Sequence, residues 1–233
     1  SSDGKFIVYV SDQTGETELF MQEANGGEPV QLTKENDTYI EAFKLSPDSK
    51  TIVYADRKNR LRVVDVASKQ MTTLMQDSLG WPEDLSFSPD SKWIAYTRKA
   101  NNDFSIIYIY NLTEKKEYAV TDKWYNSGSP IFSTDGKYLI FSSARDFNPN
   151  YGSMEWNHVY NNMYGVYLVL LSKDTPSPFL EKDAQVNREK KDDALISSIS
   201  KKGANSDKKD IKANKKDTVT AVKIDVDGLV DRV

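Results

Sequence analysis

The chain has 233 residues, a formal net charge of −4, 38% apolar residues and no cysteine. The near balance of charge gives no electrostatic reason to expect nucleic acid as a partner, and the lack of cysteine excludes disulfides, zinc–thiolate sites and cysteine nucleophiles. No stretch approaches the roughly 20 apolar residues of a membrane-spanning helix, so we expect no membrane partner.

The chain opens on a motif that returns three times. SSDGKFIVYV at 1–10 is followed by SPDSKTIVYA at 46–55, SPDSKWIAYT at 88–97 and STDGKYLIFS at 133–142. The central aspartates Asp3, Asp48, Asp90 and Asp135 are separated by 45, 42 and 45 residues. In each copy Pro, Asp, Ser or Gly favours a tight turn, and the β-branched and aromatic run that follows favours a strand.

Each copy also has further predicted strands around it. Apolar stretches precede the turn at 42–45 and 84–87; second runs follow at 18–22, 61–66, 105–112 and 165–171, and short last runs at 29–33, 71–75, 117–121 and 176–180. Four strands in about 42 to 45 residues, without helical periodicity, are typical of β-propeller blades. We therefore predict an all-β fold of four-stranded antiparallel meanders, with about 3.5 blades of a partial ring over residues 1–180. Because these sheets are apolar on both faces, each must stack against a neighbour.

The fourth repeat contains a long loop at 145–164, rich in aromatic and amide side chains. Long ordered loops on a rigid scaffold often carry recognition residues. We name Tyr151, Trp156, His158 and Tyr160 as candidate peptide-binding residues, and we expect them to line a pocket or channel mouth together with Tyr164. The alternative is that these aromatic side chains only pin the loop onto the blades.

The last part of the chain changes in composition. Residues 181–217 are dominated by lysine, aspartate, asparagine and serine, so we expect a disordered, lysine-rich insertion there. Residues 218–233 resume with VKIDVDG, which we interpret as the start of the next strand or blade. Asp225 and Asp227 are expected to be turn and edge-strand carboxylates, since the further oxygen ligands of a calcium loop are missing.

The sequence offers no catalytic residues, cofactor site or metal site. No G-x-S-x-G, P-loop or G-x-G-x-x-G pattern occurs, and the single histidine, His158, excludes an H-E-x-x-H site. Nothing near His158 places a serine as its nucleophile. We expect this stretch to be non-catalytic.

The repeated F/L-S-P-D-G/S-K-x-I-A/V-Y pattern resembles the propeller repeats of TolB-like proteins and of peptidases that carry propellers. SSARDFNPNYGSMEWNHVYNNMYGVYLVLLSKDTPSPF at 142–179, with VKIDVDGLVDRV at 222–233, resembles the bacterial branch of the tricorn protease family. The resemblance implies a fragment of the second of two propellers in a large serine peptidase. Its catalytic residues would lie downstream, outside this chain.

In that interpretation the chain would gate or channel short or unfolded peptides towards the downstream active site. Its partners would be those peptides and the PDZ-like and peptidase domains of the same protein. We also expect that the full-length protein can form a homo-oligomer. Relatives of this type often look exported, so we expect a periplasmic or secreted protein. Two alternatives stay open: a TolB-like propeller that binds protein partners, and a propeller attached to a prolyl-oligopeptidase-type hydrolase.

Overall fold

The structure is a computed structural model, and it describes residues 1–34, 36–147, 149–151, 158–180 and 221–233. Contacts divide the chain into one unit, Ser1–Thr175 with Val219–Val233, and a second unit, Pro176–Thr218. In the described ranges of the first unit the regular elements are strands, apart from a short 3-10 helix, η1 (Val230–Arg232). No helix in the described part of the chain is long and apolar enough to span a bilayer.

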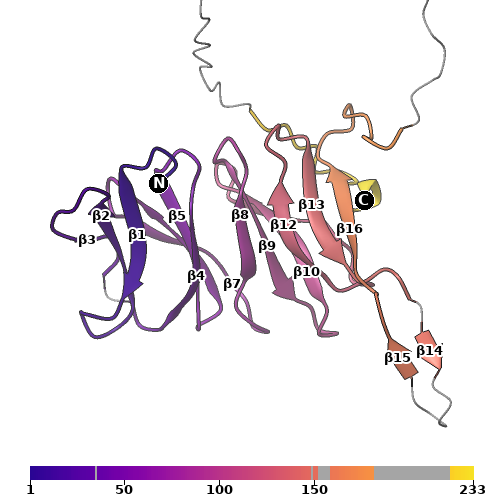
Figure 1. Cartoon of the computed structure of the whole chain (residues 1–233), viewed down its shortest axis with the longest axis horizontal. Coiled ribbons are helices and arrows are strands. Elements are labelled where there is room, and N and C mark those ends of the chain that lie inside the picture. Colours follow the sequence, from indigo (N-terminus) through magenta and orange to yellow (C-terminus); the bar gives the residue numbers. More distant parts are fainter. Residues whose placement is uncertain (35, 148, 152–157, 181–220) are drawn as a thin grey trace, which may run out of the picture. The chain divides into compact units, whose positions relative to one another are not determined.

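The strands form antiparallel sheets that follow one another along the chain (Figure 1). The first sheet contains β1 (Phe6–Ser11), β2 (Glu18–Glu23) and β3 (Val30–Gln31). The second contains β4 (Ile40–Leu45), β5 (Thr51–Asp56), β6 (Arg60–Asp65) and β7 (Met71–Gln76), and the third β8 (Glu83–Phe87), β9 (Trp93–Lys99), β10 (Ser105–Asn111) and β11 (Lys116–Ala119). The fourth contains β12 (Ser127–Phe132), β13 (Tyr138–Ser143) and β16 (Gly165–Leu170), and β14 (Pro149–Tyr151) pairs with β15 (His158–Tyr160) in a separate hairpin. The predicted all-β fold of successive meanders is confirmed.

The repeated motif is the turn between the first two strands of a sheet. Between β4 and β5, Ser46 Oγ donates to Asp48 Oδ1 at 2.6 Å and accepts from the Thr51 amide at 2.9 Å. The same bonds recur with Ser88, Asp90 and Trp93, and with Ser133, Asp135 and Tyr138. The residue after the aspartate has a positive φ in every copy, at Gly4, Ser49, Ser91 and Gly136. The turn therefore recurs because one hydroxyl and one carboxylate satisfy the backbone of a tight hairpin.

Neighbouring turns are also joined to each other. The Asp48 amide donates to Ser91 Oγ at 3.1 Å, and the Ser2 amide donates to Ser49 Oγ at 3.3 Å. Each bond joins the turn of one sheet to the turn of the next. The first serine of the motif therefore stabilises its own turn, whereas the serine after the aspartate, Ser49 or Ser91, joins neighbouring sheets.

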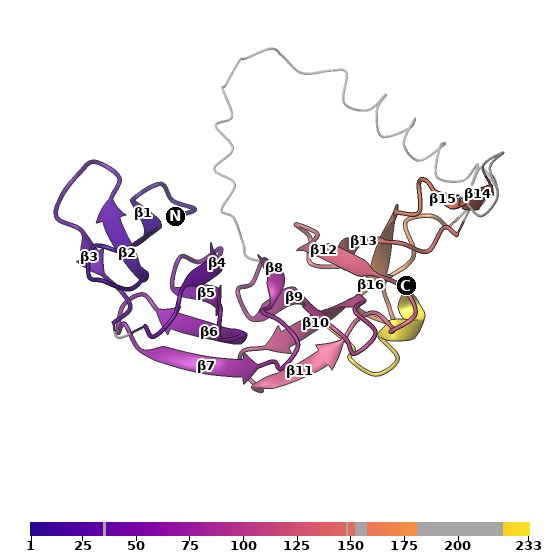
Figure 2. The same cartoon turned by 90° about the horizontal axis from the view of Figure 1, so that it is seen from below.

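Each middle strand is apolar on both sides because it has a sheet on either side. Ile52 and Tyr54 of β5 pack in a buried cluster with Leu19 of the first sheet. Val53 points the opposite way and packs with Ile94 of the third sheet. Since side chains alternate along a strand, this pattern requires two apolar neighbours. Figure 2 shows the sheets side by side, with β4, β8 and β12 on the inner side of the row and β7 and β11 on its outer side.

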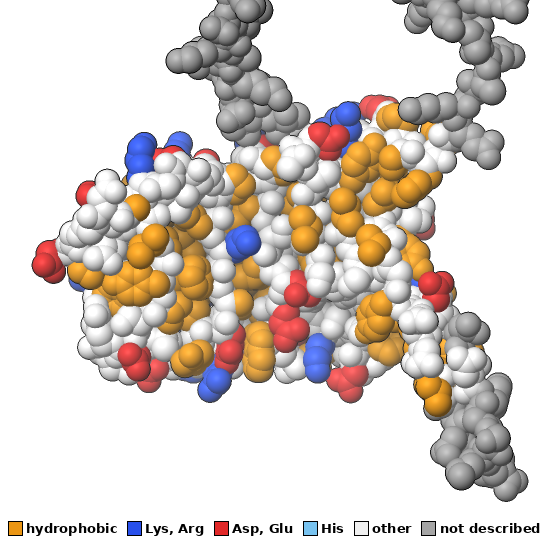
Figure 3. All heavy atoms as spheres, viewed as in Figure 1, with side chains coloured by type: hydrophobic (Ala, Val, Ile, Leu, Met, Phe, Trp, Pro, Cys, Tyr) orange, Lys and Arg blue, Asp and Glu red, His pale blue; other side chains and the backbone are white. Residues whose placement is uncertain are grey.

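The two end faces of this row lack such a neighbour in the described part of the chain. Ile7 of β1 corresponds to the fully buried Ile52, yet it is 51% exposed. Ile140 of β13 corresponds to the fully buried Val53 and is 39% exposed, and Val166 beside it is 80% exposed. Hydrophobic side chains gather accordingly over β1 and over β12, β13 and β16 in Figure 3. The four sheets do not close into a ring.

Two strands expected near the end of the chain are not formed. Residues 176–180 contain a turn without strand pairing, and residues 221–226 have no strand ladder. Prolines at 176 and 178 cannot donate to a ladder, which accounts for the first difference. In the second segment the Asp225 amide instead donates to the Leu171 carbonyl at 2.9 Å, and Leu229, which follows the segment, packs in the buried cluster of the fourth sheet. The expected insertion at 181–217 lies outside the described residues.

Candidate functional site

The first strands of three sheets together form an open groove. β4, β8 and β12 contact one another along the inner side of the row of sheets (Figure 2). The groove has a volume of about 500 Å³ and is lined by Ser2, Lys44, Leu45, Pro47 and residues 84–87 and 129–132. Because each lining strand is the inner edge of its sheet, the groove presents both side chains and backbone groups that lack a strand partner on that side.

The strands of the groove are bulged, and hydrogen bonds between sheets hold the bulges. The pairing register shifts between Glu83 and Ser86 in β8 and between Gly128 and Ile131 in β12. Asp84 and Ser129 have φ of 53° and 54°, which is strained for residues with a side chain. Asp84 Oδ2 accepts from the Ser129 amide at 2.8 Å, so one carboxylate joins the two bulges.

The lining of the groove combines apolar side chains with a few charged and hydroxyl groups. Leu45, Phe87 and Ile131 supply apolar surface, whereas Lys44 and Asp84 supply one charge of each sign. Serines occur in the lining, but the only histidine of the chain lies on β15 and is not among the lining residues. No group of three or more His, Asp or Glu side chains that could hold a metal ion occurs among the described residues.

The structure brings together only part of the candidate set in the loop at 145–164. Tyr151 and His158 face each other as a backbone pair of the β14–β15 hairpin. Tyr160 ends β15, is exposed, and its ring lies tilted against that of Phe147, with ring centroids 5.7 Å apart. Trp156 lies outside the described residues. Because Phe147 and Tyr160 both belong to this loop, their contact is internal to it and does not decide between peptide binding and attachment of the loop to the blades. Peptide binding by the four residues stays a prediction.

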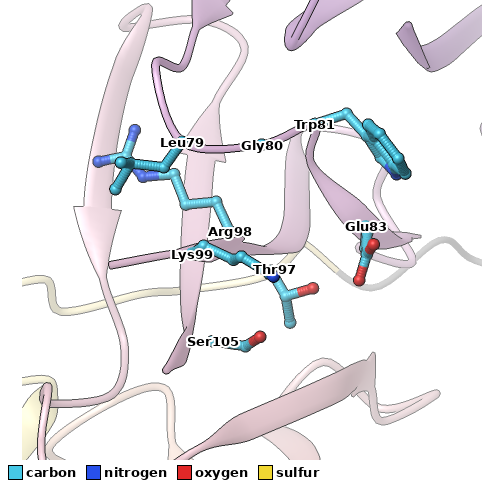
Figure 4. A pocket seen from close by; sticks show the side chains of 8 residues that line it. All are labelled: Leu79, Gly80, Trp81, Glu83, Thr97, Arg98, Lys99 and Ser105. Carbon is cyan, nitrogen blue, oxygen red and sulfur yellow. The ribbon is translucent and has the colours of Figure 1, made fainter. Parts of the chain in front are cut away.

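A smaller pocket lies between the β7–β8 connection and the third sheet, and Arg98, one of its two cationic side chains, already has partners. It has a volume of about 150 Å³ and is lined by Leu79, Gly80, Trp81, Glu83, Thr97, Arg98, Lys99 and Ser105 (Figure 4). The Arg98 guanidinium lies 3.2 Å from the Glu117 carboxylate and 3.5 Å from Asp77, and it stacks 4.1 Å above the Tyr108 ring. Burial raises the pKa of the Tyr96 phenol, which donates to Glu117. Because Asp77 follows β7 and Arg98 lies on β9, the cluster joins two sheets, and we interpret it as structural.

Sequence reasoning did not single out the groove residues. The apolar stretches at 42–45 and 84–87 indicated strands, but only the order of strands in each sheet shows that they form the inner edge. Asp84 and Ser129, which lie in the two bulges, have a positive φ. The sequence does not predict this, because residues with a side chain usually avoid that conformation.

In a comparison with known protein families, one family model matches the whole length of the chain. The model of the family described as "Tricorn protease second beta propeller domain" matches residues 1–233. The "Tricorn protease homolog 1" of Streptomyces coelicolor is 28% identical over 182 residues, which covers 76% of this chain and 17% of that protein. The chain thus spans about a sixth of the length of this relative.

Two solved structures agree in fold. A crystal structure of the tricorn protease aligns with a TM-score of 0.72 and 17% identity over 98% of this chain and 20% of that one. A putative TolB from Agrobacterium tumefaciens aligns with a TM-score of 0.52 and 20% identity over 72% of this chain and 58% of that one. At such identities a likeness shows the shared propeller architecture and leaves function to other arguments.

Proposed function

Because the chain belongs to the family of second β-propeller domains of tricorn proteases, we propose that it is a non-catalytic part of a serine peptidase that channels peptides to an active site elsewhere in the same protein. The peptides would be short or unfolded. Cleavage, its catalytic residues and the PDZ-like and peptidase domains belong to parts of the protein outside this chain.

The groove along β4, β8 and β12 carries this proposal. Its volume of about 500 Å³ suits a few residues of extended chain, whereas a folded domain of 100 residues has a radius of gyration of roughly 13 Å. A passage walled by such strands would admit an extended peptide and exclude a folded protein by size alone. The mixture of apolar side chains with one charge of each sign gives contact without strong selection by charge.

The proposal also gives a peptide-binding role to the loop residues Tyr151, Trp156, His158 and Tyr160. They would contact the peptide at one end of the passage, where the hairpin extends from the fourth sheet. Alanine at Tyr160 would then raise the KM for peptides more than it lowers kcat, because it removes a binding contact and no catalytic group.

The test is peptide hydrolysis by the full-length protein with its groove narrowed. Ser86→Trp places a large ring in the groove, and Thr72→Trp adds the same ring to an exposed position of the outermost strand β7. We expect Ser86→Trp to slow the cleavage of fluorogenic oligopeptides and unfolded casein about tenfold, equivalent to about 1.4 kcal/mol, with little change for Thr72→Trp. A tightly folded substrate should resist both variants and the unchanged protein.

Two other results would contradict the proposal. Equal rates for Ser86→Trp and Thr72→Trp would show that peptides do not pass the groove. A folded full-length protein that cleaves no peptide would favour the alternative of an interaction propeller, to which the TolB-like fold is equally suited. Location in the periplasm or outside the cell stays a prediction, which cell fractionation would test.

A further inference from the structure

A third concave surface lies at the end of the sheets opposite the Ser–Asp turns. This aromatic pocket has a volume of about 530 Å³. Its apolar lining comes from the β9–β10 and β11–β12 connections and from the long loop after β13: Phe104, Trp124, Tyr125, Phe147, Met163 and Tyr164. In an antiparallel meander these connections all leave the sheets at the same end.

The aromatic side chains of this pocket are unusually exposed. Trp124 is 79% exposed, Phe147 69% and Tyr164 59%. Among the described residues the lining includes no charged side chain, so its surface suits a neutral, apolar group. Large apolar patches of this kind on a protein surface mark interaction sites, and aromatic rings contribute much contact area at a small cost in entropy.

The pocket is held in shape before any ligand arrives. Asn126 Nδ2 donates to Tyr164 Oη at 2.7 Å, and Asn126 Oδ1 accepts from the Ser105 amide at 2.8 Å. One amide side chain thereby ties the β9–β10 connection and the long loop to the start of β12. The Arg145 guanidinium lies over the Tyr125 ring, 5.3 Å from its centre, and this contact helps to hold the ring in place. Contacts fixed in advance lower the entropic cost of binding.

The aromatic pocket lies beside one end of the groove. Tyr125 and Asn126 directly precede β12, and the lining of the groove along the same strand begins at Ser129. Four residues of extended strand span roughly 13 Å at about 3.3 Å per residue. One extended peptide is long enough to reach both sites.

We propose that the aromatic pocket binds a large aliphatic or aromatic side chain of an extended peptide whose following residues enter the groove. The inference rests on the proposed function, and it names the chemical class of peptide that this function would prefer. An apolar side chain matches the neutral aromatic lining, and an extended backbone matches the spacing between pocket and groove. An unfolded polypeptide exposes such side chains, whereas a folded protein buries them.

The experiment measures binding of a labelled probe peptide to the full-length protein. The probe is a short Gly- and Ser-rich peptide with one Phe, and its partner probe has Ser in place of that Phe. Trp124→Ala is compared with Trp81→Ala, which makes the same change in an exposed loop of the neighbouring pocket, and Trp124→Phe is the conservative variant. Circular dichroism and the unfolding midpoint confirm that each variant is folded.

We expect Trp124→Ala to weaken binding of the Phe probe about tenfold, as for a central aromatic contact of an interface. Trp81→Ala should leave the affinity unchanged, Trp124→Phe should retain most of it, and the Ser probe should bind weakly to every variant. Equal affinity of Trp124→Ala and Trp81→Ala for the Phe probe would overturn the inference. So would a change of oligomeric state in Trp124→Ala without loss of peptide binding, because the pocket would then hold a second copy of the chain.

The groove variant separates this inference from the proposed function. If Trp124→Ala binds the probe normally while Ser86→Trp still slows hydrolysis, the pocket inference is wrong and the channel proposal stands. If Trp124→Ala does not weaken probe binding and Ser86→Trp does not slow hydrolysis, the pocket inference and the channel proposal are both wrong.

Discussion

The Ser88 hydroxyl makes both side-chain bonds of its turn while it is fully buried. It donates to Asp90 at 2.6 Å and accepts from the Trp93 amide at 2.9 Å. We predict that Ser88→Ala lowers the free energy of unfolding by about 1–3 kcal/mol, because it leaves a buried amide without this acceptor. Chemical denaturation of the chain checks this value. Ser68→Ala, in an exposed turn, should cost less, and equal costs for the two changes would contradict the argument.

Several turn carboxylates make stability depend on pH in one direction. Bonds from the Lys173 amide and the Ser172 hydroxyl hold the pKa of Asp225 below its ordinary value of 3.8. The Ser133 hydroxyl lowers the pKa of Asp135 in the same way. A pKa that is lower in the folded state than in the unfolded state contributes stability above the unfolded value, and this contribution is lost as the pH falls through the folded value.

We therefore predict that the free energy of unfolding decreases as the pH is lowered below about 4. Asp225→Asn removes one of these groups, so its unfolding free energy should change less between pH 5 and pH 2 than that of the unchanged chain. Denaturation curves at a series of pH values check both statements. A variant with the full pH dependence would show that Asp225 has the same pKa in both states.

At the scale of the strand, residues at the same position of different sheets show whether another sheet packs against that face. Val53 of β5 is fully buried, while Ile140, at the same position of β13, is partly exposed. We predict that Val53→Ser costs about 2–4 kcal/mol in the isolated chain and that Ile140→Ser costs below about 1 kcal/mol. In the full-length protein the cost of Ile140→Ser should rise towards that of Val53→Ser as a further blade covers it. An unchanged cost there would mean that the face of β13 stays open.

The sequence predicts the strands that carry the repeated turn and fails where a strand depends on distant partners. The runs at 51–55 and 93–97 follow an identical turn and coincide with β5 and β9. The segment at 222–226 alternates apolar with charged residues, which also favours a strand, but the Val222 amide bonds to the Asp90 carboxylate, 132 residues earlier, in place of a strand. Local pattern cannot reveal such a distant acceptor.

Less of the candidate site than of the fold could be predicted from the sequence. An aromatic loop can be recognised by composition, and this led to Tyr160, which the structure places against Phe147. Trp124 lies outside that loop, and its place beside Tyr164 depends on a bond between Asn126 and Tyr164, 38 residues apart. Pockets formed by several connections appear only when the order of the sheets is known.

At the scale of the whole molecule, the row of sheets combines two demands. The inner strands must stay apart to leave a groove, whereas the middle strands must pack closely to bury their apolar faces. The bulges of β8 and β12 meet both demands, since they bend the inner strands locally while β9 and β13 keep regular pairing with β10 and β16. Asp84 joins these two bulges through the Ser129 amide, so the wall of the groove is braced where it departs from regular structure.

The exposed end faces lead to a prediction about the chain on its own. Ile7 at one end and Ile140 with Val166 at the other leave apolar sheet surface in contact with water. We predict that the isolated 233-residue chain self-associates through these faces as its concentration rises, because stacking two sheets removes that surface from water. Sedimentation velocity over a range of concentrations measures the effect.

The double variant Ile7→Lys with Ile140→Lys should sediment as a monomer, since each lysine places a charge in the face that would be buried. Its matched control, Tyr39→Lys with Leu79→Lys, alters two exposed apolar residues away from the end faces and should associate like the unchanged chain. If both double variants were monomeric, general solubility and not the end faces would govern association. If the unchanged chain stayed monomeric at every concentration, the end faces would be stable in water, and apolar burial would not be the force that stacks these sheets.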